Sequence, residues 1–462
     1  MSQRGALLLP HVSQYDVDFV IPRIGVDIPV GIDPFLLFKS RNPEYRELHR
    51  QLTDAFNAGI EAVKRGALDD ARRLFDYPEE SAIGFGYTRK GKGGSGVGSY
   101  LAGLIVDTAS NSPGLQERGV RHIEEMQLLA SHIGPDRVSD ITANVLKQFL
   151  IEYTQRQADI WQLPLRAGVP IQHVYDHSAA EWIDTYADLP IDSSDGAPIL
   201  LVPRRLVRQL PWINYDDFLK TEFSAYLSAR RSQVRPTAAP EPRAKPDVVS
   251  ITRADLGLVE RYVKSREQRA DDATPDTNYI DEDVCARADA LTARLGAVEA
   301  GRDAAKNYQL LVLEILNFLF NPDLADGKPE VKTLDGTERR DIIFTNESDE
   351  SFWAYVRTNH DGIFLMFETK NMRELDIAAI NQTATYLGDR IGRVGIIVTR
   401  NAPGENIQRK IFSVWNDSAS ARKVILVLTD EHLKELLQVR CRNGSTSKWV
   451  QRHYREFRTT VQ

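Results

Sequence analysis

The chain has 462 residues, more than one hydrophobic core usually serves, so two or more domains are expected. An apolar content of 42% and a charged content of 27% describe an ordinary soluble globular protein. The net charge of −7 excludes a basic surface over the whole chain. Any nucleic-acid-binding surface must therefore be local.

The cysteines and the N-terminus bear on the cellular compartment. Cys285 and Cys441 lie far apart and form no Cys-x-x-Cys pair, which argues against a disulfide framework and against a cysteine-rich zinc site. The apolar patch from Ala6 to Leu9 is too short for a signal peptide. No run reaches the roughly 18 apolar residues that predict a membrane span. We expect a cytoplasmic protein without a membrane segment.

Residues 1–231 are predicted to form the larger domain, a mixed α+β and helix-rich structure of no recognisable fold. Residues 15–38 have strand-like apolar patterning interrupted by proline and glycine. A helix is predicted to begin at Pro43, and two more are expected at about 114–132 and 140–162. We expect this domain to recognise a DNA feature, a signal or a partner.

A glycine-rich segment, residues 84–103, contains GxxxxGK, the first part of a phosphate-binding P-loop. Gly93 stands where Ser or Thr should hold Mg²⁺, which argues against a Walker-type ATPase. Arg89, Lys90 and Lys92 still suit binding of an anion, such as a nucleic-acid phosphate or a nucleotide signal. An ordinary surface loop is the open alternative.

Two further patterns suggest a metal without specifying one. His173 and His177 have the spacing of zinc ligands on one helix, but no other ligand cluster accompanies them. A structural or exposed pair is the favoured interpretation. Four acids in the first segment could hold a cation, although turn and strand-edge positions explain them more simply: Asp16, Asp18, Asp27 and Asp33.

Residues 232–250 read SQVRPTAAPEPRAKPDVVS, which predicts a semi-rigid, proline-rich linker. A charged, helical connector is expected over residues 251–302. The α/β domain is expected over 303–440, followed by a basic, aromatic tail over 441–462.

Residues 303–440 alternate helices and strands. A nearly all-apolar helix, AAKNYQLLVLEILNFLF, precedes the strands EVKTL and RRDIIFTN. A short helix is expected next, with strand–turn–strand as the open alternative, and the buried strand GIFLMFETKN follows. Alternating helices and strands complete the region and predict a mixed α/β sheet flanked by helices.

Three charged residues at strand ends carry the chemistry. Glu368 and Lys370 lie two apart on one strand and therefore on one face, and Asp341 opens a neighbouring strand. Two carboxylates and water are how proteins typically hold Mg²⁺, which can activate a bound water and stabilise charge on a phosphate. Lys370 would position that water or neutralise the developing charge. Simple ion pairs are the alternative, with Asp341 bound to Arg339 or Arg340.

This pattern resembles the PD-(D/E)XK nuclease superfamily, in its type IV restriction-endonuclease branch, over about a third of the chain. The resemblance implies a restriction-endonuclease-like fold and a catalytic set of Asp341, Glu368 and Lys370. It adds Glu314 as a further acidic ligand and Gln382 as a polar site residue. Arg340 replaces the usual proline, and 27 residues separate Asp341 from Glu368, so an insertion must be accommodated.

The C-terminal tail interleaves aromatic and basic side chains. This mixture suits phosphate contact with base stacking, and a final helix packed on the domain is the open alternative. The candidate nucleic-acid-binding residues are Lys448, Trp449, Arg452, Arg455 and Arg458.

The hypothesis is a Mg²⁺-dependent endonuclease, able to use Mn²⁺, that hydrolyses DNA in restriction or defence. The N-terminal domain would regulate it in response to a nucleotide or protein trigger, and cutting a duplex suggests a homodimer. The alternative is a non-catalytic nucleic-acid-binding or nucleotide-sensing regulator that uses the nuclease fold as a scaffold. Dependence on a divalent metal separates the two.

Overall fold

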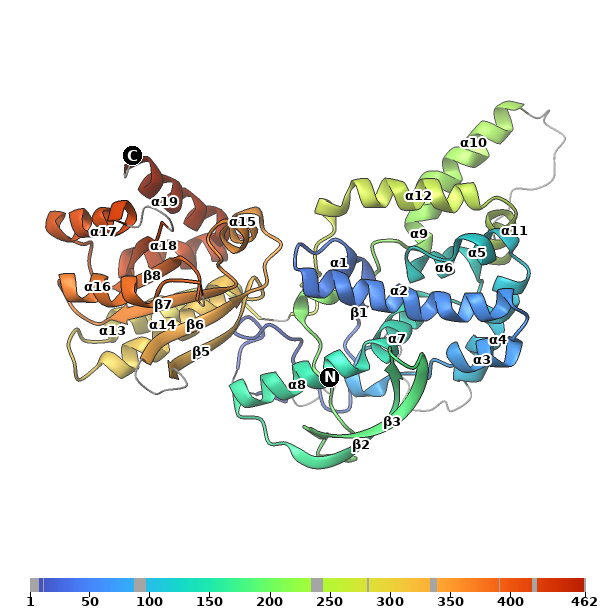
Figure 1. The fold of residues 1–462 in the computed structure, drawn as a ribbon, viewed down its shortest axis with the longest axis horizontal. Helices are drawn as coiled ribbons and strands as arrows, with labels where there is room; N and C mark the ends of the chain where they lie inside the picture. The colour runs from blue at the N-terminus through green and yellow to red at the C-terminus, as the bar shows by residue number, and fades with distance from the viewer. Residues whose placement is uncertain are drawn as a thin grey trace. The chain divides into compact units, whose positions relative to one another are not determined.

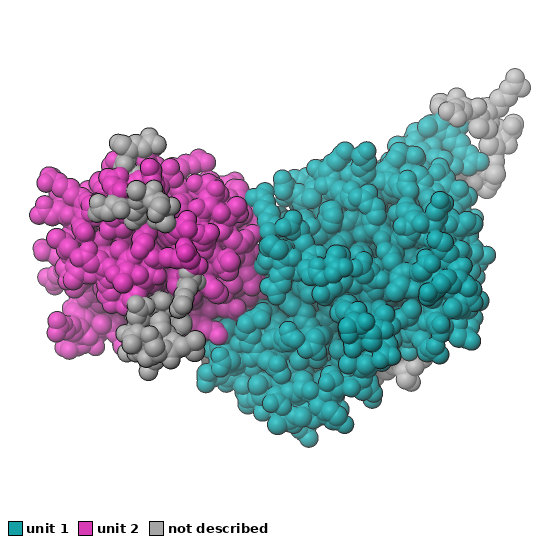
Figure 2. All heavy atoms as spheres, in the orientation of Figure 1, with its two compact units in different colours: residues 1–10, 19–279 teal, residues 11–18, 280–462 magenta. Residues whose placement is uncertain are grey.

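The chain forms two compact units (Figure 2). Unit 1 comprises residues 1–10 and 19–279, and unit 2 comprises residues 11–18 and 280–462. The computed structural model describes residues 8–10, 12–86, 97–233, 244–280, 282–332, 339–389, 391–417 and 422–460.

Unit 1 is mainly helical (Figure 1). Its helices are α1 (Pro34–Phe38), α2 (Pro43–Lys64), α3 (Leu68–Leu74), α4 (Val97–Ser110), α5 (Pro113–Arg118), α6 (Met126–Leu129), α7 (Pro135–Val145), α8 (Lys147–Trp161), α9 (Tyr215–Phe218), α10 (Ser224–Gln233), α11 (Lys245–Ala254) and α12 (Leu256–Gln268). Its strands form two antiparallel pairs: β1 (Gly31–Ile32) with β4 (Val207–Arg208), and β2 (Arg166–Asp176) with β3 (Glu181–Leu189). The short turns are η1 (Ser81–Ile83), η2 (Ile123–Glu125), η3 (Arg204–Leu206), the π-helical η4 (Leu219–Phe223) and η5 (Ala270–Asp272).

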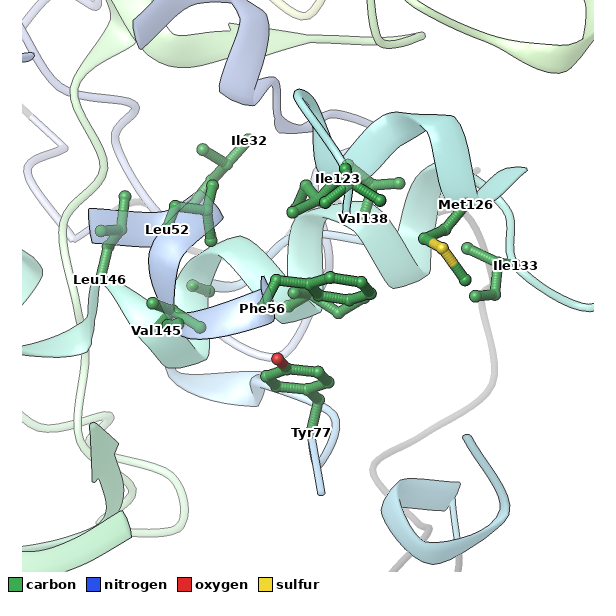
Figure 3. Close-up of a cluster of buried hydrophobic side chains, with 14 of the residues drawn as sticks. Ile32, Leu52, Phe56, Tyr77, Ile123, Met126, Ile133, Val138, Val145 and Leu146 are labelled. Atoms are coloured by element: carbon green, nitrogen blue, oxygen red, sulfur yellow. The ribbon is translucent and has the colours of Figure 1, made fainter. Parts of the chain in front are cut away.

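Helix α2 is the central element of the unit 1 core. The predicted start is confirmed, because the side chain of Asn42 accepts the backbone N–H of Glu44 at 3.0 Å and Pro43 occupies the first turn. The apolar stripe of α2 is buried, and the ring of Phe56 lies parallel to that of Tyr77 with centroids 6.4 Å apart. Figure 3 shows the side chains that gather around these two rings from α2, α7 and the segment near Ile123.

Other N-terminal predictions were wrong in part. Residues 15–38 form almost no strand, only β1 and the short helix α1, because the repeated prolines and glycines interrupt the pairing. The helix expected at 114–132 is broken after α5, where Gly119 adopts a positive φ of 69°. The helix expected at 140–162 is two helices, α7 and α8, joined at Leu146.

The proline-rich segment 232–250 falls within the span of unit 1. Residues 234–243 lie outside the described residues, and α11 already begins at Lys245. The division between the units lies at Tyr279 and Ile280, where no comparable cluster of prolines occurs. The expected helical connector is therefore divided, with α12 in unit 1 and α13 in unit 2.

Unit 2 is a mixed α/β structure around one five-stranded sheet, as predicted at the level of fold class. The strands are β5 (Leu324–Lys332), β6 (Arg339–Asn346), β7 (Phe364–Lys370), β8 (Val394–Thr399) and β9 (Val424–Thr429). The helices are α13 (Val284–Ala297), α14 (Ala305–Phe320), α15 (Ser351–Asn359), α16 (Ile377–Tyr386), α17 (Glu405–Asp417), α18 (Asp430–Cys441) and α19 (Thr446–Thr460).

The strands lie in chain order (Figure 1). Strands β5, β6 and β7 are antiparallel neighbours, whereas β7, β8 and β9 run parallel. The parallel strands are joined through α16 and α17, as a parallel pair requires a crossover connection. Because β7 and β8 are parallel neighbours, their carboxyl ends lie side by side.

Two apolar layers cover the two faces of the sheet. Leu365 and Phe367 of β7 pack in the cluster that includes α14 and α18. Met366, which alternates with them, packs in the cluster that includes α16 and α17. Side chains of β7 with even numbers therefore face α16.

The expectation against a disulfide was wrong. Cys285 of α13 and Cys441 of α18 form one, with Cα atoms 4.6 Å apart. The two cysteines are 156 residues apart in the sequence, but α13 and α18 pack against each other in unit 2. Sequence separation did not reveal that packing.

A short N-terminal segment belongs to unit 2. The carboxylate of Asp16 binds the guanidinium of Arg287 at 2.6 Å, and the amide of Asn321 donates to the Asp16 carbonyl at 2.7 Å. The ring of Tyr15 meets that of Phe318 edge-on at 5.8 Å. Residues 12–18 are thus part of the core of unit 2.

Within the described parts of the chain, the helices are all too short or too polar to cross a bilayer.

Candidate functional site

Strand β7 places Glu368 and Lys370 on the face of the sheet that α16 covers. Both residues share the alternation of Met366, whose side chain packs against that helix layer. Glu368 is only 2% exposed, whereas the Lys370 side chain is 21% exposed. The strand therefore buries the carboxylate and leaves the ammonium within reach of a ligand.

The side chains of Glu368, Lys370 and Gln382 form a connected group. The Lys370 Nζ donates to Glu368 Oε1 at 2.7 Å and to Gln382 Oε1 at 3.2 Å. Gln382 Nε2 donates in turn to the Tyr386 hydroxyl at 3.0 Å. A charge-assisted hydrogen bond of this kind is stronger than a neutral one, so Glu368 fixes the ammonium in place.

Helix α16 positions Gln382. Asp376 caps the helix by accepting the backbone N–H of Ala379 at 2.8 Å, and Ile380 and Thr383 are buried against the sheet. Gln382 and Tyr386 lie four residues apart, and their direct contact follows from that helical spacing. The sequence singled out Gln382 and missed Tyr386, which the same spacing could have identified.

The backbone of β6 brings position 341 to this group. Ile342 pairs with Phe367 across the antiparallel β6–β7 ladder. Continuing that register by one residue sets Asp341 opposite Glu368. The side chain of Asp341 lies outside the described residues.

Glu314, the further acid implied by the resemblance, belongs to a different group. It lies on α14, the helix that packs with Leu365 and Phe367 on the opposite layer. Its carboxylate accepts two hydrogen bonds from Arg294, each 2.7 Å, and one from Arg287 at 2.6 Å. The structure thus gives Glu314 a structural ion-pair role in unit 2.

The oxygen-bearing side chains at these positions are of the type that binds a hard cation such as Mg²⁺. Glu368 offers a carboxylate, and position 341, opposite it in the sheet, is an aspartate. Carboxylate oxygens together with water are the ligands that Mg²⁺ prefers. Among the side chains that the structure describes, no three His, Cys, Asp or Glu residues gather as a metal site.

The predicted basic tail is the amphipathic helix α19. Its inner face is fixed to unit 2: the Trp353 indole donates to Ser447 Oγ at 2.9 Å, and His360 Nε2 lies 2.9 Å from the Tyr454 hydroxyl. The candidate residues separate between the two faces of the helix. Those on the outer face are Lys448, Arg452 and Arg455.

Trp449 and Arg458 point the other way. Trp449 is half-buried and stacks on His453 with centroids 5.6 Å apart. The guanidinium of Arg458 lies 4.5 Å from the centroid of the Trp415 ring and donates to the Tyr454 hydroxyl at 2.9 Å. These two candidates therefore have packing partners within unit 2.

Arg89, Lys90 and Lys92 lie outside the described residues. His173 and the residues around it form strand β2 and the turn after it, so the helical spacing assumed for His173 and His177 was wrong.

His173, Asp16 and Asp33 each have partners within their own unit. His173 stacks on Trp182 at 4.6 Å, and its Nε2 lies 2.6 Å from the Asp76 carbonyl oxygen. Asp33 caps α1 by accepting the Phe35 N–H at 3.1 Å in unit 1, whereas Asp16 binds Arg287 in unit 2. Burial raises the pKa of Asp16 to about 6, and Arg287 opposes that shift.

Comparisons with known proteins give little functional information. Residues 10–214 match a family described as a domain of unknown function, DUF8370. The chain is 27% identical over 150 residues to a putative transposon gamma-delta 80.3 kDa protein of Escherichia coli K12. That match covers 32% of this chain and 21% of the transposon protein, so the chain spans about a fifth of that relative. No solved structure matches the chain.

Proposed function

We propose that unit 2 is a Mg²⁺-dependent endonuclease that hydrolyses phosphodiester bonds in DNA. The observation that carries this proposal is the contact of Glu368, Lys370 and Gln382 at the end of β7. The hairpin of β6 and β7, which carries Asp341 and Glu368 and is followed by a helix and another strand, also has the order of elements that the resemblance to PD-(D/E)XK nucleases implies.

The residues at this site would contribute in three ways. Lys370 stabilises the negative charge that develops on the scissile phosphate, or orients the attacking water. Glu368 and Gln382 hold the Lys370 ammonium in position through their oxygen atoms. Asp341 and Glu368 would hold Mg²⁺, which when bound lowers the pKa of a water molecule and offsets phosphate charge.

The test is a cleavage assay with the full chain. Supercoiled plasmid, linear duplex, single-stranded DNA and RNA are incubated with Mg²⁺, with Mn²⁺ or with EDTA. We expect DNA cleavage with either metal and none in EDTA. Absence of cleavage with both metals on every substrate would overturn the proposal. Cleavage of RNA alone would show that the substrate is RNA and not DNA.

The pairing of Glu314 favours a second candidate. Because Arg287 and Arg294 occupy its carboxylate, the site has one acid fewer than the resemblance implies. A nucleic-acid-binding regulator without cleavage activity needs no metal ligands at all. Metal-independent DNA binding without cleavage would support that candidate.

The biological setting is a proposal of the same kind. Similarity to a protein named for a transposon agrees with a role concerning mobile or foreign DNA, such as restriction or defence. Unit 1 would then regulate the nuclease in response to a nucleotide or protein trigger, in the cytoplasm. A homodimer would supply the two sites needed to cut both strands, which sedimentation analysis with and without DNA tests.

A further inference from the structure

A cleft of about 440 Å³ opens beside Lys370 at the end of β7. One wall is the segment that leads into α14, with Arg302 and the first helical residue Ala305, and the other is the segment after β7, with Arg373. Among the described residues that line the cleft, three are cationic and none is acidic. Asp303 and Glu374 follow the two arginines in the sequence but do not line the cleft.

Hydrogen bonds fix both walls to one another. The side-chain nitrogen of Asn371, Nδ2, donates to the backbone carbonyl oxygens of Glu299, at 3.0 Å, and Gly301, at 2.8 Å. In return, the Gly301 N–H donates to the Asn371 carbonyl at 2.9 Å. The chain just before Arg302 is therefore bound directly to the residue that follows Lys370.

Arg400 connects the same two segments through further hydrogen bonds. Its guanidinium donates to Asn371 Oδ1 at 2.8 Å and to the Val298 carbonyl at 2.6 Å. Asp430 holds the same guanidinium at 2.9 Å. Arg400 is thus committed to the scaffold, whereas Arg302 and Arg373 project from the walls and are exposed.

The cleft suits a phosphate group. A guanidinium presents several N–H donors in a planar fork that matches phosphate oxygens. Helix α14 begins at Ala305 on the rim and has no side-chain cap, so its first backbone N–H groups add to the field that attracts an anion. Lys370 belongs both to this cleft and to the group with Glu368. A polymer with regularly spaced phosphates could occupy both places at once.

We propose that the cleft binds a phosphate of the substrate strand next to the scissile one, and that Arg302 and Arg373 are positioning residues. This inference rests on the proposed nuclease function and names the part of the substrate that the site holds. The ligand is a polynucleotide backbone, because the inference assigns one phosphate to the arginines and a second, scissile one to the Glu368 group.

The test compares full-length variants. Arg302→Ala, Arg373→Ala and the double variant remove the cations, and Arg302→Lys with Arg373→Lys retains the charge. Arg409→Ala is the control, because Arg409 is an exposed arginine of α17 that does not line the cleft. Binding of fluorescent DNA in EDTA is measured across a salt series, and kcat and KM are measured with Mg²⁺.

We expect the double alanine variant to lower the slope of log affinity against log salt by about 1–2, because each lost phosphate contact removes about 0.7–0.9. KM should rise about tenfold with a smaller change in kcat, which is the pattern of lost substrate binding. The double lysine variant should keep most of the salt slope. Arg409→Ala should match the wild type.

The outcomes separate this inference from the proposed function. If the wild type cleaves DNA and the double alanine variant matches Arg409→Ala in slope and KM, the cleft assignment is overturned and the nuclease remains. If the wild type never cleaves but the slope still falls in the double alanine variant, the nuclease proposal fails and the phosphate site stands. Absence of DNA binding by the wild type overturns the cleft assignment.

Discussion

Units 1 and 2 both bury carboxylates, but in different surroundings. In unit 1, Glu124 and Asp33 are buried close together, and burial together with the charge of Asp33 raises the pKa of Glu124 well above its ordinary value. In unit 2, Glu368 is equally buried, but it accepts a hydrogen bond from Lys370, which lines an open cleft. Burial alone therefore does not distinguish the two carboxylates. Glu368 is set apart by its partner Lys370, which lines a cleft.

The largest expected effect concerns the disulfide, which one unit contains and the other lacks. Both cysteines of the chain lie in unit 2, so only that unit contains a disulfide. Closing a loop of 156 residues restricts the unfolded chain, so we expect Cys285→Ser to lower the free energy of unfolding of unit 2 by about 4–5 kcal/mol. Calorimetry of the oxidised protein with and without dithiothreitol measures this effect.

The variant Cys285→Ser is also the control for the reductant, since its unfolding should not respond to dithiothreitol. An unchanged wild-type transition, with thiol labelling showing that the bond was intact before reduction, would contradict the expected stabilisation. A change in the transition of unit 1 alone would remove this difference between the units.

The second effect tests the cation beside Glu368. Lys370→Ala should reduce cleavage by about 10²–10³-fold, as expected for loss of a group that stabilises transition-state charge. The fold should persist, because the Lys370 side chain is partly exposed. Single-turnover cleavage and thermal unfolding are the measurements.

Lys434→Ala is the matched control for Lys370→Ala. Lys434 is a lysine of α18 whose ammonium also binds a nearby glutamate, Glu431, at 2.6 Å, but it lies outside the Glu368 group. Full cleavage by Lys370→Ala would remove Lys370 from the mechanism. A loss of equal size in Lys434→Ala would point to a general effect of charge.

The third effect tests the contrasting carboxylate in unit 1. Because the folded-state pKa of Glu124 lies above its ordinary value of 4.5, folding favours its protonated form. This contribution to stability is fully present below pH 4.5 and is lost as the pH rises through the raised pKa. Glu124→Gln should remove that loss and raise the melting temperature at pH 8 by a few degrees relative to the wild type.

Thermal unfolding at pH values from 5 to 8 measures this contrast. Glu117→Gln is the control, since Glu117 is an exposed glutamate of the neighbouring helix α5 and should give the pH profile of the wild type. If wild type and Glu124→Gln showed parallel profiles, Glu124 would be ionised in the folded protein and the expected pKa shift would be wrong.

The two units also differ in how well the sequence predicted them. In unit 2, RRDIIFTN coincides with β6, and the strands ending at Lys370 and Thr399 were predicted with small errors at their boundaries. Each is a short apolar run bounded by turn residues, so local pattern and tertiary environment agree. Lys370 contacts Gln382, and the sequence had singled out both residues.

Non-local contacts account for most of what the sequence did not reveal. The pairing of Glu314 with Arg294 and the entry of Asp16 into unit 2 depend on packing between segments far apart in the chain. In unit 1, residues 19–30 form turns and isolated bridges, for which hydrophobic periodicity gives no signal. The breaks after α5 and at Leu146 are further helix boundaries that the apolar periodicity did not reveal.

The smallest expected effect concerns the outer face of α19. Lys448, Arg452 and Arg455 share that face, while Trp449 and Arg458 pack inward. If the outer face contacts DNA, replacing its three cations with alanine should lower the salt slope of binding by up to about 2–3, since each phosphate contact releases bound counterions. Trp449→Ala should instead lower the melting temperature and leave the salt slope nearly unchanged.

A control variant with the same net charge separates a specific surface from bulk electrostatics. Alanine at Lys64, Arg65 and Arg72 removes three exposed cations from unit 1, which was not predicted to bind DNA through these residues. Binding of the same labelled duplex across a salt series compares the two triple variants. Equal slopes would assign α19 to packing alone. If the slope is lower only in the α19 variant, the DNA-binding surface lies on unit 2, which also carries Glu368 and Lys370.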